Sequence, residues 1–187
     1  ERGGNSVSLC TGTLISRNLV LTARHCVAAM KGLDSNDDVI CGQSRFGSTY
    51  DADSVKYVTP AHDLRTRDGE RIRSSVSPAR RVDRIDVPRS SDEFCNSDIA
   101  LLTLGRPIPA STTKPIPPRI AKPATEGETF TAIGYGLDGS KDHSSGLRRR
   151  ADGETVDKVC GTSNCGNSPR EFHAVAATCQ GDSGGPA

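Results

Sequence analysis

The 187-residue sequence contains no tryptophan, and aromatic residues make up only 4% of it. It also lacks an apolar run long enough to span a bilayer, an internal repeat and a heptad pattern. No charge dominates, because 24 basic side chains are balanced by 23 acidic ones, so no general field draws the chain to a polyanion. We therefore expect neither a nucleic-acid nor a membrane partner.

Cysteine, in contrast, is abundant, with seven in the chain. The spacing matches no CxxC…CxxC or Cys/His zinc pattern, so we expect no metal and no cofactor. Disulfides in an oxidising compartment fit better, which predicts a secreted, periplasmic or extracellular protein. An odd number leaves one thiol free or bonded outside this sequence.

The last residues form the most informative segment, Cys179-Gln180-Gly181-Asp182-Ser183-Gly184-Gly185-Pro186. Its small and turn-forming residues predict a tight loop. Such a loop can be an ordinary surface turn. It can also present a serine hydroxyl to a substrate, with backbone N–H groups beside it to stabilise a developing negative charge. We favour the catalytic interpretation.

A histidine follows two predicted strands near the start of the chain. Residues 9–15 and 19–23 are short, apolar and typical of strands, and the second leads into His25 and Cys26. A single histidine after a strand is often structural. Here Cys10 lies one hairpin earlier, so a disulfide to Cys26 would fix the histidine backbone, as a catalytic site requires.

Asp98 stands at the entrance of an apolar run, residues 99–104, that must be core. An acid there is costly unless it has a partner. It could cap a turn, but a histidine partner explains it better. Further strands are expected at residues 38–42, 82–88, 129–136, 147–151, 154–160 and 172–177.

Six of the eleven prolines lie within residues 105–126. A run of this kind cannot supply inner strands, so we interpret it as a connection between residues 1–104 and residues 127–187. Residues 60–81 are polar and rich in arginine. We favour a solvated loop there over a binding exosite.

Taken together, three blocks resemble the chymotrypsin/trypsin family of serine endopeptidases. They are the histidine block Leu21-Thr22-Ala23-Arg24-His25-Cys26, the aspartate block Ser97-Asp98-Ile99-Ala100-Leu101-Leu102 and the serine block Gly181-Asp182-Ser183-Gly184-Gly185-Pro186. Their order in the chain is that of this family and differs from that of the subtilisins and the α/β-hydrolases. The resemblance implies an all-β fold of two antiparallel Greek-key barrels. The first would carry His25 and Asp98, and the second, incomplete here, would carry Ser183.

The resemblance also implies a role for each site residue. Ser183 would be the nucleophile, His25 the general base and acid, and Asp98 the group that orients the imidazole. The backbone N–H groups of Gly181 and Ser183 would form the oxyanion hole. Asp182 resembles the acid that pairs with a new N-terminal ammonium after an activating protease has cut the chain.

For the cysteines, the family implies a bond between Cys10 and Cys26 and a partner for Cys179 beyond the serine block. The family does not fix the other four. We expect Cys41–Cys95 and Cys160–Cys165, while other pairings of these four stay open.

Four departures from the family pattern stand out. Arg24 replaces the small residue usual before the histidine; it could act on the charge of the histidine, but we expect it to point outward, because a buried unpaired guanidinium is costly. Ala177 occupies the place of the acid that selects Lys or Arg, which indicates an uncharged residue before the cleaved bond. The family's activation segment and final strands are also missing, so we expect a piece of a longer protein with little activity by itself.

The sequence thus predicts a serine endopeptidase that acts on proteins or peptides and is monomeric when complete. The alternative is a pseudoprotease that keeps the fold and serves as a binding or regulatory module. An intact serine block favours the enzyme, whereas Arg24 and the unseen ammonium partner of Asp182 favour the alternative.

Overall fold

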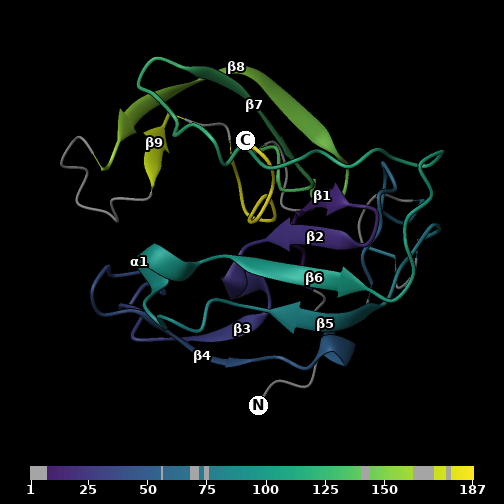
Figure 1. Ribbon diagram of the computed structural model, residues 1–187, viewed down its shortest axis with the longest axis horizontal. Coiled ribbons are helices and arrows are strands. Elements are labelled where there is room, and N and C mark those ends of the chain that lie inside the picture. Colours follow the sequence, from purple (N-terminus) through teal and green to yellow (C-terminus); the bar gives the residue numbers. More distant parts are fainter. Residues whose placement is uncertain are drawn as a thin grey trace.

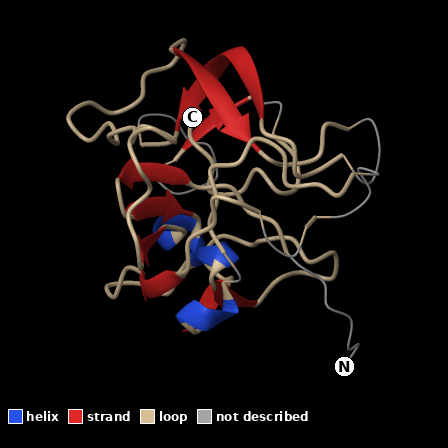
Figure 2. Ribbon diagram, turned by 90° about the vertical axis from the view of Figure 1, so that its right-hand side faces the viewer, coloured by secondary structure: helices blue, strands red, loops and turns tan. Residues whose placement is uncertain are grey.

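The computed structural model describes residues 8–55, 57–67, 72–73, 76–139, 144–161, 171–175 and 178–187. Strands dominate this part of the chain, and every strand pair is antiparallel. The helices are single turns, drawn in blue in Figure 2. The structure therefore confirms the predicted all-β class.

A four-stranded sheet in the order β1-β2-β6-β5 forms the centre of the N-terminal part. Its core face comes from simple alternation along the strands, since Ala100, Leu102 and Leu104 are buried while the residues between them are half-buried. These side chains pack in one cluster with Val82, which is fully buried. The strands are β1 (Thr13–Ser16), β2 (Leu19–Thr22), β5 (Val82–Asp86) and β6 (Ala100–Leu104).

A two-stranded sheet of β3 (Ala28–Lys31) and β4 (Arg45–Thr49) lies beside it (Figure 1). The strand predicted at residues 38–42 was wrong, because this segment forms turns. Its backbone groups are bonded locally: the Asp34 carboxylate accepts the N–H of Asp38 at 2.9 Å, and the Ser44 hydroxyl accepts that of Ile40 at 2.8 Å. The remaining short elements are η1 (Arg24–Cys26), η2 (Ala52–Ser54) and α1 (Phe94–Ser97).

The C-terminal part contains a three-stranded sheet of β7 (Thr129–Gly134), β8 (Arg149–Val159) and β9 (Phe172–Ala174). The two strands predicted at residues 147–151 and 154–160 are one continuous strand, β8. Figure 1 shows this sheet apart from the other two, with the C-terminal end of the chain between the two groups.

The two parts of the chain also meet through backbone hydrogen bonds. The Leu64 N–H donates to the Gly146 carbonyl and the Arg148 N–H donates to the His62 carbonyl, both at 2.8 Å. The Tyr135 hydroxyl donates to the Ala61 carbonyl at 2.7 Å, and burial raises the pKa of this phenol. Residues 105–126, all described, contain no strand or helix. The domain division at this segment stays a prediction.

Three arginines in the described part of residues 60–81 bind acidic side chains or backbone carbonyls. Arg65 binds both carboxylate oxygens of Asp63 at 2.9 Å and lowers the pKa of Asp63 to about 2. Arg73 donates to the Asp63 carbonyl, and Arg81 pairs with Asp53. These contacts fit the solvated loop better than a free basic exosite.

Two of the expected disulfides are present, Cys10–Cys26 and Cys41–Cys95. The predicted Cys160–Cys165 pair lies outside the described residues, because Cys165 is not among them. Cys179 is an exposed free thiol. None of the helices in the described part of the chain has the length and hydrophobicity that crossing a membrane requires.

We expect Leu102→Ala to lower the free energy of unfolding by about 2–5 kcal/mol, since it opens a cavity in the centre of the four-stranded sheet. Ile120→Ala is the control, because Ile120 is 90% exposed and its loss should cost no more than about 0.5 kcal/mol. Urea denaturation of both variants measures the difference. Equal stability of the two would contradict the assignment of the core.

Candidate active site

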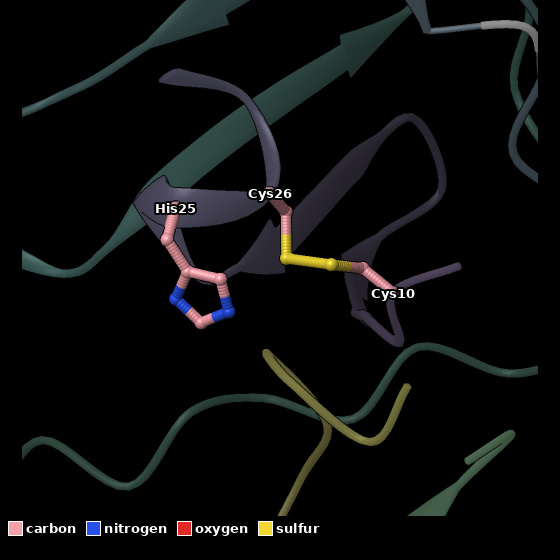
Figure 3. A group of neighbouring side chains, drawn as sticks. All are labelled: Cys10, His25 and Cys26. Carbon is pink, nitrogen blue, oxygen red and sulfur yellow. A yellow bond between two sulfur atoms is a disulfide. The ribbon is translucent and has the colours of Figure 1, made fainter. Parts of the chain in front are cut away.

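His25 lies in η1, directly after strand β2. The neighbouring Cys26 is bonded to Cys10, so the backbone at the histidine is tied to the segment that precedes β1. In Figure 3 the imidazole projects to one side of this disulfide. The three side chains lie within 4.8 Å of one another, but both sulfurs are consumed in the disulfide and offer no thiolate to a metal.

Asp98 is the C-cap residue of α1 and lies two residues before β6 begins at Ala100. Because β2 and β6 are antiparallel neighbours with Thr22 opposite Ala100, the end of β2 lies next to the start of β6. The Asp98 carboxylate holds His25 twice. One oxygen accepts the His25 backbone N–H at 2.9 Å, and the other lies 2.7 Å from Nδ1 of the ring.

The face of the His25 ring stacks on Phe94, at 6.0 Å between centroids. Phe94 in turn stacks on Phe46 at 5.0 Å, and the Arg24 guanidinium lies 4.5 Å from the centre of the Phe46 ring. Arg24 and His25 are adjacent in sequence and stand at the two ends of this stack. The imidazole is therefore restrained both by a carboxylate at its edge and by an aromatic ring at its face.

The outward orientation predicted for Arg24 was wrong, since this residue is only 6% exposed. Its Nη1 donates to the Ser91 carbonyl at 2.9 Å and approaches the Pro88 carbonyl and the Ser97 hydroxyl at 3.4 and 3.5 Å. Carbonyl oxygens and the ring of Phe46 take the place of a counter-ion. The Nε atom is buried without a hydrogen-bond partner among the described residues.

The loop that carries Ser183 packs on the strand that leads to His25. A Cβ atom on Gly184 would lie 2.2 Å from the Thr22 hydroxyl, so only glycine permits this approach. The Ser183 carbonyl accepts the Thr11 N–H at 2.9 Å and lies 3.8 Å from the Cys26 sulfur. Figure 3 shows the yellow ribbon of the C-terminal segment passing near the imidazole. A contact between the Ser183 hydroxyl and His25 stays a prediction.

Gly181 and Asp182 shape the same loop. Gly181 is buried and has φ of +102°, a conformation that favours glycine. The Asp182 carboxylate accepts the N–H of Gly136 at 2.7 Å and that of Cys179 at 2.9 Å. Both roles predicted for them, oxyanion hole and activation salt bridge, stay predictions. Ala177, the predicted pocket residue, lies outside the described residues.

Sequence reasoning missed two neighbours of the site. Phe94 precedes Asp98 by one helical turn, but nothing in its surroundings marks it as a ring under His25. Thr11 follows Cys10 and contacts the serine loop through both its backbone and its hydroxyl. A threonine next to a cysteine is unremarkable in a sequence, so only the fold reveals this contact.

Antiparallel strands, a bonded His–Asp pair and a glycine-rich serine loop packed beside it define a protein of the chymotrypsin-type serine protease fold. The sequence model of the Trypsin family matches residues 2–187. The chain therefore belongs to the Trypsin family.

Solved structures with this fold include proteins that differ widely in sequence. Human heparin binding protein is 20% identical with a TM-score of 0.57, over 95% of this chain and 68% of the other. The scabies mite inactivated protease paralogue S-I1 is 24% identical with a TM-score of 0.55, over 95% of this chain and 70% of the other. At these identities the likeness shows the fold alone.

We expect Arg24→Ala to lower the free energy of unfolding by about 2–4 kcal/mol, because it removes the hydrogen bonds that hold the half-buried carbonyls of Pro88 and Ser91 and empties the buried space beside Phe46. Arg89→Ala is the matched control, since Arg89 is exposed in the loop that Arg24 holds. Denaturant titration of the two variants compares them. A loss for Arg24→Ala as small as that of the control would show that the guanidinium is not anchored as described.

Proposed function

We propose that this protein is a serine endopeptidase that hydrolyses peptide bonds through an acyl-enzyme. The observation that carries the proposal is the double hold of Asp98 on His25, beside the loop of Ser183. A carboxylate that binds both the backbone N–H and Nδ1 of a histidine fixes the ring and its tautomer. A bond from Nδ1 to the carboxylate leaves Nε2 as the nitrogen that could accept a proton from Ser183.

In the proposed reaction, Ser183 Oγ attacks the carbonyl carbon of the peptide bond while Nε2 of His25 accepts its proton. With Nδ1–H donated to Asp98, Nε2 is the nitrogen with a free lone pair. The imidazolium then gives the proton to the leaving amine, and the acyl-enzyme forms. A water molecule then attacks the acyl-enzyme, with His25 again as the general base, and releases the carboxylic acid product. Asp98 stabilises the imidazolium without being protonated.

The backbone N–H groups of Gly181 and Ser183 would stabilise the negatively charged oxygen of the tetrahedral intermediate by hydrogen bonds. Preorganised donors of this kind contribute about 3–4 kcal/mol each to transition-state stabilisation. The positive φ of Gly181 supports this assignment, because such a turn exposes N–H groups on one side of the loop. The segment around Ala177 is proposed to line a pocket for an uncharged side chain.

Activation is proposed to involve Asp182 and a second protease. A new N-terminal ammonium would pair with the Asp182 carboxylate. Both oxygens of this carboxylate already accept backbone N–H groups, from Gly136 and Cys179. The ammonium would therefore join an existing network and fix the loop that carries Ser183. The two disulfides support an extracellular location, and we propose a monomer.

The second candidate function is a binding module without turnover. It is favoured by the structural neighbours, which include a heparin binding protein and an inactivated protease paralogue. The residues of this chain favour turnover, because histidine, aspartate and serine are all present and the first two are bonded. The fold is common to both functions, so the choice rests on these side chains.

We expect a fluorophosphonate reagent to label Ser183 in the protein expressed from its complete gene, after limited proteolysis. Labelling should disappear in Ser183→Ala and His25→Ala, because the hydroxyl needs the imidazole to become nucleophilic. Peptide hydrolysis should fall by about 10⁴-fold or more in His25→Ala and by about 10⁴-fold in Asp98→Asn. Mass spectrometry of the labelled peptide and amidase assays provide the measurements.

His62→Ala is the matched control, since His62 is exposed and its structural contact uses only the backbone carbonyl. It should keep both labelling and turnover. A folded, proteolysed protein that neither reacts with the reagent nor cleaves peptides would overturn the endopeptidase proposal in favour of the binding module.

A further inference from the structure

Thr11 joins the histidine region to the serine loop. It follows Cys10, which is bonded to Cys26, and it is only 3% exposed. Its backbone N–H donates to the Ser183 carbonyl at 2.9 Å, and its carbonyl accepts the Thr22 hydroxyl at 2.7 Å. The Thr11 backbone is therefore held from both sides before its side chain makes any contact.

The Thr11 hydroxyl makes two further bonds to the C-terminal part of the chain. It donates to the Gly181 carbonyl at 2.8 Å and accepts the Tyr135 backbone N–H at 3.1 Å, and both bonds are buried. A hydroxyl has one donor and two acceptor positions, so the single donor of Thr11 is committed to Gly181. Valine has the same shape and can make neither bond.

Gly181 is the residue whose orientation matters most for the proposed oxyanion hole. Glycine adopts many backbone conformations, so neighbouring contacts must select one. The Gln180 carbonyl accepts the Leu137 N–H at 3.0 Å. In a planar trans peptide this carbonyl and the Gly181 N–H point in opposite directions, so the bond from Leu137 directs the N–H. The Thr11 hydroxyl holds the next peptide, on the other side of the Gly181 Cα atom.

We propose that Thr11 is a positioning residue of the oxyanion hole: its hydroxyl fixes the Gly181–Asp182 peptide and, together with the bond from Leu137, the direction of the Gly181 N–H. This inference rests on the proposed endopeptidase function. Thr11 contacts no substrate atom and acts through Gly181. The same hydroxyl also accepts the Tyr135 N–H, so Thr11 of the N-terminal part links the loop that carries Ser183 to the segment that follows β7.

The expected effect follows from what the oxyanion hole binds. Its N–H donors form stronger hydrogen bonds with the negatively charged oxygen of the transition state than with the neutral carbonyl oxygen of the bound substrate. A misdirected Gly181 N–H should therefore lower kcat and leave KM almost unchanged. Loss of a complete donor costs about 10²–10³-fold. A donor that is present but poorly aimed should cost less, about 10- to 100-fold.

The test compares Thr11→Val with Thr11→Ser in the activated protein. Thr11→Val should lose about 10- to 100-fold in kcat with KM within about twofold, and Thr11→Ser should stay within about threefold of the parent. The affinity for a peptide aldehyde, which forms an oxyanion on the serine, should fall by the same factor as kcat/KM. If Thr11 had only a structural role, Thr11→Val would lower the stability of the protein and leave kcat, KM and the aldehyde affinity unchanged.

Thr59→Val is the matched control. The Thr59 hydroxyl also donates to a carbonyl, of Pro78 at 2.6 Å, and accepts a backbone N–H, of Ala61 at 3.2 Å. Thr59→Val should lose two hydrogen bonds of the same kind without changing kcat or the aldehyde affinity. If Thr11→Val does not fold, Thr11→Ala compared with Thr11→Ser replaces it, because this pair differs only in the hydroxyl.

Unchanged kcat and aldehyde affinity in Thr11→Val would overturn the inference and leave the endopeptidase proposal intact. If the parent protein shows no turnover, the proposed function fails, and the amide resonance of Gly181 decides the role of Thr11 instead. In ¹⁵N-labelled protein this resonance should shift or broaden in Thr11→Val and stay in place in Thr59→Val. A Gly181 resonance that is identical in both would overturn the positioning role.

Discussion

The double hydrogen bond between Asp98 and His25 is the constraint on which the rest of the site depends. It exists because the end of β2 and the start of β6 are neighbours in one antiparallel sheet. The core cluster beneath that sheet keeps the two strands in register, and the carboxylate then needs only a short reach to the ring. A shift of one residue in this pairing would reverse the faces of β6 and remove the acid from the histidine.

Much of the framework could be predicted from the sequence because local signals decide it. Short apolar runs predicted the strands around His25 and Asp98. The family resemblance implied the Cys10–Cys26 disulfide, and Cys41–Cys95 was the expected one among several open pairings. The success with the strands has a physical basis, because short apolar runs bounded by turn residues leave few alternatives to a buried strand. The three-block resemblance placed the pieces in one known fold, and the match of the Trypsin family to residues 2–187 agrees with it.

The two failures have different causes: long-range packing decides the orientation of Arg24, and local turn contacts decide the conformation of residues 38–42. Arg24 was expected at the surface because an isolated buried guanidinium is costly. The cost is offset by the Ser91 carbonyl and the Phe46 ring, which lie 67 and 22 residues further along the chain. Residues 38–42 look like a strand, but turn contacts from Asp34 and Ser44 take up their N–H groups. No local pattern reveals the partners of Arg24.

The two disulfides stand at the supports of the His–Asp pair, and this arrangement links the site to the redox state of its surroundings. Cys26 adjoins His25, and Cys95 lies within α1, the helical turn that ends at Asp98. A newly made chain with free thiols lacks both cross-links. Its imidazole and carboxylate are then held by non-covalent contacts alone. The geometry of the His–Asp pair is thus coupled to the oxidation of these four cysteines.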